Sequence, residues 1–176
     1  MSKILIHQPE YLPWINLFIK MNYAEKFIFL DNVQYSRRSF QNRNLLPSTK
    51  NNKKNYITVP IQKAPFNESI NRIKIDYSEK WIDNHLEKMR ENYRKSEFFD
   101  EVFKLIINQL NINVKYLCDL NENLLKLISK ESKINCEFIK ASQLKVKGNK
   151  SDLILNICKK LEAKTYITGT GSINYL

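Results

Sequence analysis

The sequence is poor in the residues and runs that mark several protein classes. Only three of its 176 residues are glycine and five are proline, too few for a collagen-like or linker-rich chain. Its three cysteines lie far apart without a Cys-x-x-Cys pair, which argues against a disulfide framework and a structural zinc site. Its apolar runs are much shorter than the roughly 18 residues of a membrane span. We therefore expect a protein of the reducing cytoplasm, with neither a secretory signal nor membrane insertion.

The remaining composition is that of a folded domain. Hydrophobic residues make up 43% of the chain and aromatic residues 11%, enough for one core and against intrinsic disorder. A chain of this length is usually one domain. We expect a single α/β domain over residues 1–176, with a helical subregion over residues 79–132.

Basic residues outnumber acidic ones, and the surplus is uneven. The chain has 29 Lys and Arg against 18 Asp and Glu, a net charge of +11. No acidic residue lies between Asp31 and Glu68, whereas three of the six arginines lie within residues 37–43. A general bias toward lysine would explain the lysines. The clustered arginines instead indicate a local site for phosphate or carboxylate, because a guanidinium pairs well with both.

Hydrophobic patterning predicts an α/β protein. Residues 3–7 and 27–30 are short apolar runs typical of buried strands, and residues 14–24 between them have helical spacing. This strand–helix–strand order predicts parallel strands. Further strands are predicted at residues 56–61, 70–75, 136–139 and 165–168, and further helices at residues 81–93, 98–110, 114–130 and 151–161. The predicted fold class is α/β, three-layered with a mostly parallel sheet, Rossmann-like or nucleotidyltransferase-like, with a helical segment inserted in the middle.

Polar side chains follow three of the predicted strands. The first strand ends in His7 and Gln8, the second in Asp31, and the last in Thr168 and Gly169. The carboxyl ends of parallel strands meet at one edge of a sheet, and ligands of open α/β sheets bind beyond that edge. We therefore expect the functional site to lie there.

Two segments carry a family resemblance. IHQPEYLPW at residues 6–14 and FLDNVQYSRRSFQNRN at residues 29–44 resemble signature segments of the WbqC-like protein family. The resemblance continues in ITVPI at residues 57–61, in Trp81-x-x-x-His85, in Gly148-Asn-Lys-Ser151 and in YITGTGSINYL at residues 166–176. It implies a place in bacterial surface-polysaccharide biosynthesis, including that of the O-antigen sugars of lipopolysaccharide. Family members usually continue past the Tyr-Leu pair, so the resemblance also implies a C-terminal extension that is absent here.

Three residues at the predicted sheet edge are candidates for catalysis: His7, Gln8 and Asp31. A histidine after a strand suits a general base, and Gln8 would orient the substrate. Asp31 suits a second base or a partner of a nearby arginine. The alternatives are a hydrogen-bonded structural role for His7 and a turn-capping role for Asp31.

Other residues are candidates for binding substrate or phosphate. Arginine neutralises phosphate, side-chain amides orient sugar hydroxyls, and tyrosine stacks on rings. A helix start and the glycines after a strand allow backbone N–H groups to approach an anion. The predicted set is Tyr11, Gln34, Arg37, Arg38, Asn42, Arg43, Asn44, Lys150, Ser151, Gly169, Gly171 and Ser172. His85 is a further candidate, although its spacing with Trp81 and Met89 also indicates a half-buried helix face.

These residues and the resemblance favour an enzyme that acts on a nucleotide-sugar. It would transfer or ligate an acyl or aminoacyl group to the amine of a nucleotide-linked amino sugar. His7 would take the amine proton, and Arg37, Arg38 and Arg43 would hold the diphosphate. The chain has no metal-binding motif, no Walker A motif and no Gly-x-Gly-x-x-Gly, so the donor stays open between ATP-activated and acyl-CoA forms.

Two alternatives remain at this stage. The first is a nucleotidyl- or sugar-transferring enzyme of the same pathway, in which Asp31 would be the best-placed ligand of a divalent cation. The second is a non-enzymatic RNA-binding module, which the net positive charge favours. A charged tRNA as acyl donor would also account for the basic surface. The sequence leaves the oligomeric state open.

Overall fold

The computed structural model describes residues 2–47 and 55–169, which divide into two compact units. Of the described residues, the sheet unit comprises 2–9, 14–33 and 128–169, and the helical unit comprises 10–13, 34–47 and 55–127. Each unit contains a hydrophobic core of its own.

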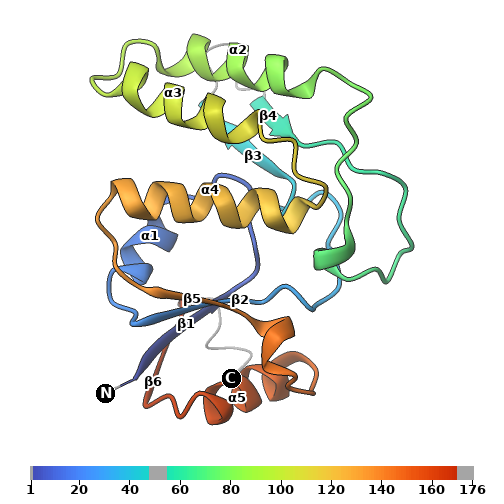
Figure 1. Cartoon of the computed structure of the whole chain (residues 1–176), viewed down its shortest axis with the longest axis vertical. Helices are drawn as coiled ribbons and strands as arrows, with labels where there is room; N and C mark the ends of the chain where they lie inside the picture. The colour runs from blue at the N-terminus through green and yellow to red at the C-terminus, as the bar shows by residue number, and fades with distance from the viewer. Residues whose placement is uncertain (1, 48–54, 170–176) are drawn as a thin grey trace. The chain divides into compact units, whose positions relative to one another are not determined.

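Four parallel strands form the sheet unit, in the order β5-β2-β1-β6 (Figure 1). The central strand β1 pairs with both neighbours, so that Leu5 lies beside Phe27 on one side and Ile167 on the other. The elements of this unit are β1 (Lys3–His7), α1 (Ile15–Met21), β2 (Lys26–Phe29), β5 (Glu137–Lys140), the 3₁₀ helix η2 (Ala141–Leu144), α5 (Lys150–Lys160) and β6 (Thr165–Ile167). The predicted parallel strand–helix–strand start is confirmed.

Helices cover both faces of this sheet, which gives the predicted three layers (Figure 1). On one face, Ile4 and Ile28 pack in one cluster with Leu153 of α5. Side chains alternate along a strand, so Leu5 and Phe27 point to the opposite face, where α1 lies. Strands that are covered on both faces need no polar side, which explains the continuous apolar runs that predicted β1 and β2.

The helical unit combines a strand pair with helices. β3 (Arg43–Leu46) and β4 (Asn55–Thr58) are antiparallel. They are followed by the 3₁₀ helix η1 (Ile70–Arg72), α2 (Trp81–Tyr93), α3 (Phe99–Leu110) and α4 (Leu117–Glu131), whose last turn belongs to the sheet unit. The core of this unit collects buried side chains from β4, from all three helices and from the loop residue Tyr11.

The strand predicted at residues 70–75 is wrong. Ile70–Arg72 forms a 3₁₀ turn in which the N–H groups of Arg72 and Ile73 donate to the carbonyls of Ser69 and Ile70. Only the last two residues make isolated antiparallel bridges, Lys74 to Tyr116 and Ile75 to Ile61. The apolar residues are buried as expected, but local hydrogen bonds replace a strand ladder.

The sequence did not predict β3, because half of its buried face is polar. Asn44 and Leu46 point to the core, and both are buried. An asparagine at a core position hides the alternation that marks a strand. Within the part of the chain that the structure describes, every helix is too short or too polar to cross a membrane.

Candidate functional site

The carboxyl ends of the four parallel strands lie at one edge of the sheet, as the sequence predicts. His7 ends β1 and pairs in register with Phe29, the last residue of β2. Asp31 follows β2 by two residues, and Gly169 follows β6 by two. These residues therefore extend beyond neighbouring strand ends. We call this edge, with His7, Gln8, Asp31 and Gly169, the strand-end site.

His7 is half-buried and has a defined tautomer. Its Nδ1 lies 2.9 Å from the carbonyl oxygen of Gln8. A carbonyl oxygen only accepts hydrogen bonds, so in the neutral ring Nδ1 carries the hydrogen and Nε2 carries the lone pair. The ring is thereby prepared to accept a proton at Nε2. Gln8, predicted to orient the substrate, also positions His7 through its backbone.

Asp31 binds a backbone N–H, as its structural interpretation expects, but the partner is Ser142, 111 residues away, and not its own turn. Its Oδ1 accepts the backbone N–H of Ser142 at 2.8 Å, and its Oδ2 accepts the Ser142 hydroxyl at 2.6 Å. Its side chain is almost fully buried, at 1% exposure. Asp31 thus connects the end of β2 to the 3₁₀ helix after β5. The role of a base or metal ligand stays a prediction, which this geometry does not favour.

A lysine that the sequence did not nominate lies near the end of β6. The ammonium nitrogen of Lys20, from α1, is 3.9 Å from the position that a Cβ on Gly169 would take. Gly169 is exposed, so this cation stands beside an accessible stretch of backbone. Gly171 and Ser172, predicted to continue this segment, lie outside the described residues.

The start of α5 depends on a glycine. Gly148 has a φ of +141°, and a Cβ there would lie 2.9 Å from the backbone nitrogen of Leu153. Lys150 and Ser151 follow at the exposed first turn, and Asn149 occupies the N-cap position without a side-chain cap. A helix after a parallel strand starts on the carboxyl side of the sheet. The predicted anion cradle of Lys150 and Ser151 is therefore on the correct side and stays a prediction.

The three clustered arginines belong to the helical unit, where two of them bind backbone carbonyls. Arg37 donates to the carbonyl of Ala64 at 3.2 Å, and Arg43 donates to that of Arg38. The Arg43 guanidinium also lies 4.4 Å from the ring centre of Tyr56. Arg38 is exposed and has a φ of 58°. These contacts give Arg37 and Arg43 a structural function. Binding of a diphosphate by the three arginines stays a prediction.

The predicted amides also bind backbone groups. Gln34 donates to the carbonyl of Phe66 at 2.9 Å, and Asn42 donates to that of Val59 at 3.0 Å. Asn44 donates to the carbonyls of Tyr11 and Leu12. Asn42 and Asn44 are buried, at 7% exposure each. Of these amides, only Gln34 is exposed.

Tyr11 and His85 form a buried hydrogen-bonded chain in the helical unit. The Tyr11 hydroxyl lies 3.0 Å from His85 Nδ1, and His85 Nε2 lies 3.1 Å from the carbonyl oxygen of Thr58. Because that carbonyl only accepts, Nε2–H is the donor and the tyrosine O–H donates to Nδ1. Tyr11 is fully buried and His85 is 3% exposed. In this structure neither side chain is accessible to a substrate. His85 shares a helix face with Trp81 and Met89, as their spacing predicts, but it is buried and not half-buried.

Burial controls the protonation of both groups. Burial lowers the pKa of His85 from 6.5 to about 4, although its hydrogen bond to Thr58 opposes the shift and the charge of Lys88 adds to it. Burial raises the pKa of Tyr11 well above its ordinary value. Both side chains are therefore neutral at pH 7, which suits a structural chain of hydrogen bonds.

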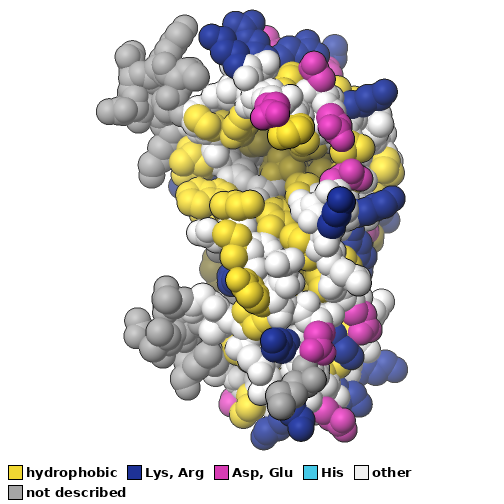
Figure 2. Space-filling view, turned by 90° about the vertical axis from the view of Figure 1, so that its left-hand side faces the viewer, with side chains coloured by type: hydrophobic (Ala, Val, Ile, Leu, Met, Phe, Trp, Pro, Cys, Tyr) yellow, Lys and Arg dark blue, Asp and Glu magenta, His cyan; other side chains and the backbone are white. Residues whose placement is uncertain are grey.

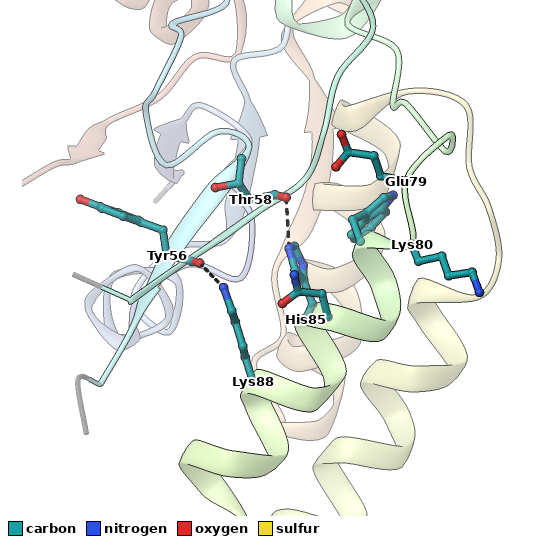
Figure 3. A pocket seen from close by; sticks show the side chains of 8 residues that line it. Tyr56, Thr58, Glu79, Lys80, His85 and Lys88 are labelled. Atoms are coloured by element: carbon teal, nitrogen blue, oxygen red, sulfur yellow. Dashed lines mark hydrogen bonds between the residues drawn. The ribbon is translucent and has the colours of Figure 1, made fainter. Parts of the chain in front are cut away.

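A pocket that the sequence did not predict opens between β4 and the start of α2 (Figure 3). Its volume is about 320 Å³. Lys88 and His85 of α2 point toward the carbonyls of Tyr56 and Thr58 on β4. The sequence contained no signal for this pocket, because a lysine three residues after a histidine on a helix does not indicate which strand the two side chains face. No three potential metal ligands cluster among the described residues.

Comparison with known proteins adds the following. The sequence model of the WbqC-like protein family matches residues 8–176. A protein of Mycobacterium tuberculosis, described as "Uncharacterized protein Rv1507c", is 26% identical over 181 residues, which cover all of this chain and 76% of that protein. No solved structure matches the chain.

Proposed function

The chain belongs to the WbqC-like protein family, and we propose that it is an enzyme of bacterial surface-glycan biosynthesis. Its reaction is the transfer or ligation of an acyl or aminoacyl group to the amine of a nucleotide-linked amino sugar. The substrate class rests on the family resemblance, and the reaction rests on the strand-end site. We take the reaction to occur in the cytoplasm, where nucleotide-sugars are made.

The observation that carries this proposal is the orientation of His7. Its Nδ1–H is committed to the carbonyl of Gln8 at 2.9 Å, so the basic lone pair is at Nε2. The ring stands at the carboxyl end of the central strand, where open α/β sheets bind ligands. A half-buried imidazole with Nδ1 held by the backbone presents Nε2 as the acceptor that general-base catalysis requires.

In the proposed reaction the amine nitrogen attacks the acyl carbonyl carbon, and a C–N bond forms. His7 Nε2 accepts the proton that the amine loses and later passes it to the departing group as the bond between the acyl carbon and that group breaks. The Lys20 ammonium beside Gly169 would stabilise negative charge on the acyl oxygen or on a phosphate. The departing group is the thiol of an acyl-CoA or the phosphate of an ATP-activated acyl group.

The face of the molecule drawn in Figure 2 bears on the RNA-binding alternative. On the face shown in Figure 2, Lys and Arg side chains are interspersed with Asp and Glu. Nucleic-acid modules usually gather basic side chains into a patch or stripe that follows the phosphate backbone. The mixed charges on this one face do not favour the RNA-binding alternative.

The test begins with binding and ends with turnover. Thermal shifts of the full chain are measured with UDP- and dTDP-amino sugars, acyl-CoA, ATP with Mg²⁺, and tRNA. A ligand that binds only the folded state at 100 times its Kd stabilises it by about 2.7 kcal/mol. We expect a shift with an amino-sugar nucleotide and with one donor class, followed by an N-acylated product in mass spectrometry.

His7→Ala is then compared with Lys3→Ala, an exposed change on the same strand. We expect His7→Ala to lower the rate by about 10²–10⁴-fold, with an unchanged thermal shift by the sugar nucleotide, and Lys3→Ala to leave the rate intact. Full activity of His7→Ala would overturn the general-base assignment. A shift with tRNA alone would overturn the nucleotide-sugar proposal.

A further inference from the structure

The pocket between β4 and α2 faces the outer edge of a β-strand. The N–H of Val59 donates to the carbonyl of Asn42 at 2.7 Å, which fixes the phase of hydrogen bonding between β3 and β4. Tyr56 and Thr58 are therefore the residues whose backbone groups point away from β3. Their carbonyls bind Lys88 at 3.1 Å and His85 at 3.1 Å, which confirms this direction. Their N–H donors point to the same side.

Lys88 brings a positive charge to this edge. Its side chain is half-buried and makes one hydrogen bond, to the Tyr56 carbonyl (Figure 3). The ion pairs found among the described residues are Lys26 with Glu137 and Lys126 with Glu122, so Lys88 has no carboxylate partner within that part of the chain. An ammonium has three N–H donors, and two of them remain for a ligand.

The rest of the lining combines donors and acceptors. Lys80 is among the lining residues, but its ammonium points away from Lys88 and His85 (Figure 3), and Asn84 adds an exposed amide. Glu79 is the acidic group of the lining. His85 is neutral and has both ring nitrogens engaged. The donors thus belong to Lys88, to the edge of β4 and to Asn84, which is the pattern that an oxyanion requires.

We propose that this pocket is a second ligand site, which binds a phosphorylated or carboxylated monosaccharide through its oxyanion. The Lys88 ammonium and the edge N–H groups of β4 hold the phosphate or carboxylate, and Asn84 and Glu79 bind sugar hydroxyls. The volume of about 320 Å³ is at the lower end of small-molecule sites, which span roughly 300–1,000 Å³. This site lies within the helical unit and does not depend on the reaction proposed for the strand-end site.

The experiment uses a tryptophan in the wall of the pocket. The chain has two tryptophans, and Trp81 lines the pocket whereas Trp14 is 56% exposed. In a Trp14→Phe background, Trp81 is the sole tryptophan and its emission reports on occupancy. Glucose 1-phosphate, glucuronate, inorganic phosphate and neutral glucose are titrated at constant ionic strength. We expect a saturable change with glucose 1-phosphate or glucuronate and none with glucose.

Variants then test the contacts. Lys88→Met keeps the aliphatic stem and removes the charge, and we expect about tenfold weaker binding or more, because hydrogen bonds to charged groups are the strong ones. Lys104→Met, an exposed change on α3, is the matched control and should bind as the parent does. Asn84→Asp adds a negative charge to the lining without touching the bonds from α2 to β4. It should weaken binding even if Lys88→Met is poorly folded.

The comparison of ligands also identifies the anion. Tighter binding of glucose 1-phosphate than of glucuronate assigns the site to phosphosugars, and the reverse order assigns it to acidic sugars. If inorganic phosphate binds with the same affinity as glucose 1-phosphate, the sugar adds nothing to binding, and the sugar part of the proposal is overturned. Three results would overturn the site. They are equal binding of glucose and glucose 1-phosphate, no saturable change with any ligand, and unchanged affinity in both Lys88→Met and Asn84→Asp.

Discussion

The hydroxyl of Tyr11 and Nδ1 of His85 lie 3.0 Å apart inside the helical unit, although 74 residues separate them in the sequence. The contact joins a loop that directly follows β1 to the second helix. Both side chains are buried, so the loop is held by a specific hydrogen bond as well as by apolar packing.

Tyr11→Phe should destabilise the protein. The change keeps the ring in the core but leaves the buried Nδ1 of His85 without its donor, which costs about 1–3 kcal/mol. Tyr23→Phe removes a hydroxyl from a side chain that is 66% exposed, and should change the free energy of unfolding by less than about 0.5 kcal/mol. Urea denaturation of both variants measures the difference, and equal effects would contradict the buried bond.

Stability should fall as the pH falls from 6.5 toward 4. Above pH 6.5 His85 is neutral in both the folded and the unfolded state. Burial lowers the pKa of His85 from 6.5 in the unfolded state to about 4 in the folded state. Between these two pKa values only the unfolded state takes up the proton. The loss reaches about 3 kcal/mol and levels off below the folded-state pKa.

His85→Asn isolates this contribution, since asparagine does not titrate. The free energy of unfolding is measured in urea at several pH values, and the slope of the variant is subtracted from that of the parent. A parent and a variant with the same slope between pH 4 and 6.5 would show that another group is responsible.

Asp31 and Ser142 should be energetically coupled. Two hydrogen bonds, at 2.8 and 2.6 Å, join this carboxylate to one residue, and a hydrogen bond to a charged group is worth about 1.5–3 kcal/mol. In a double-mutant cycle, Asp31→Ala and Ser142→Ala should be non-additive by about 1 kcal/mol, because Ser142→Ala removes only the hydroxyl bond. Asp31→Ala with Ser78→Ala is the control, and should be additive.

Gly148→Ala should destabilise the start of α5. The backbone there has a φ of +141°, and a Cβ would lie 2.9 Å from the nitrogen of Leu153, so the cost is at least about 1 kcal/mol. Among the described residues, a Cβ on Gly169 would meet only the Lys20 ammonium, at 3.9 Å, so Gly169→Ala should be nearly neutral. Thermal unfolding of the two variants measures the difference. A smaller effect of Gly148→Ala than of Gly169→Ala would contradict the requirement for glycine at residue 148.

The sequence predicts an element well when its signal is local. β1 and β2 were predicted because strands covered on both faces are apolar throughout. β3 was not, because the buried Asn44 depends on carbonyls of Tyr11 and Leu12, 33 and 32 residues away, and no local pattern records such partners. The strand at residues 70–75 failed because apolar residues do not distinguish a ladder from a buried 3₁₀ turn.

The candidate site divides in the same way. The strand-end site was predictable because parallel topology alone brings His7 and Asp31 to one edge of the sheet. The hydrogen bonds of Arg37 and Arg43 to backbone carbonyls were not predictable. The sequence does not show whether an arginine binds a ligand phosphate or a carbonyl of its own chain. The pocket at Lys88 depends on which side chain covers the edge of β4, and that follows only from tertiary packing.

The order of the strands also constrains how the protein is made. β1 lies between β2 and β6, and Lys3 pairs with Thr165. A ribosome that has just released residue 127 has delivered every segment of the helical unit, but the sheet still lacks two of its four strands. During synthesis, β1 and β2 must therefore wait with unpaired edges until β5 and β6 emerge. During this interval the unpaired edges can pair with other chains, which exposes the nascent chain to aggregation.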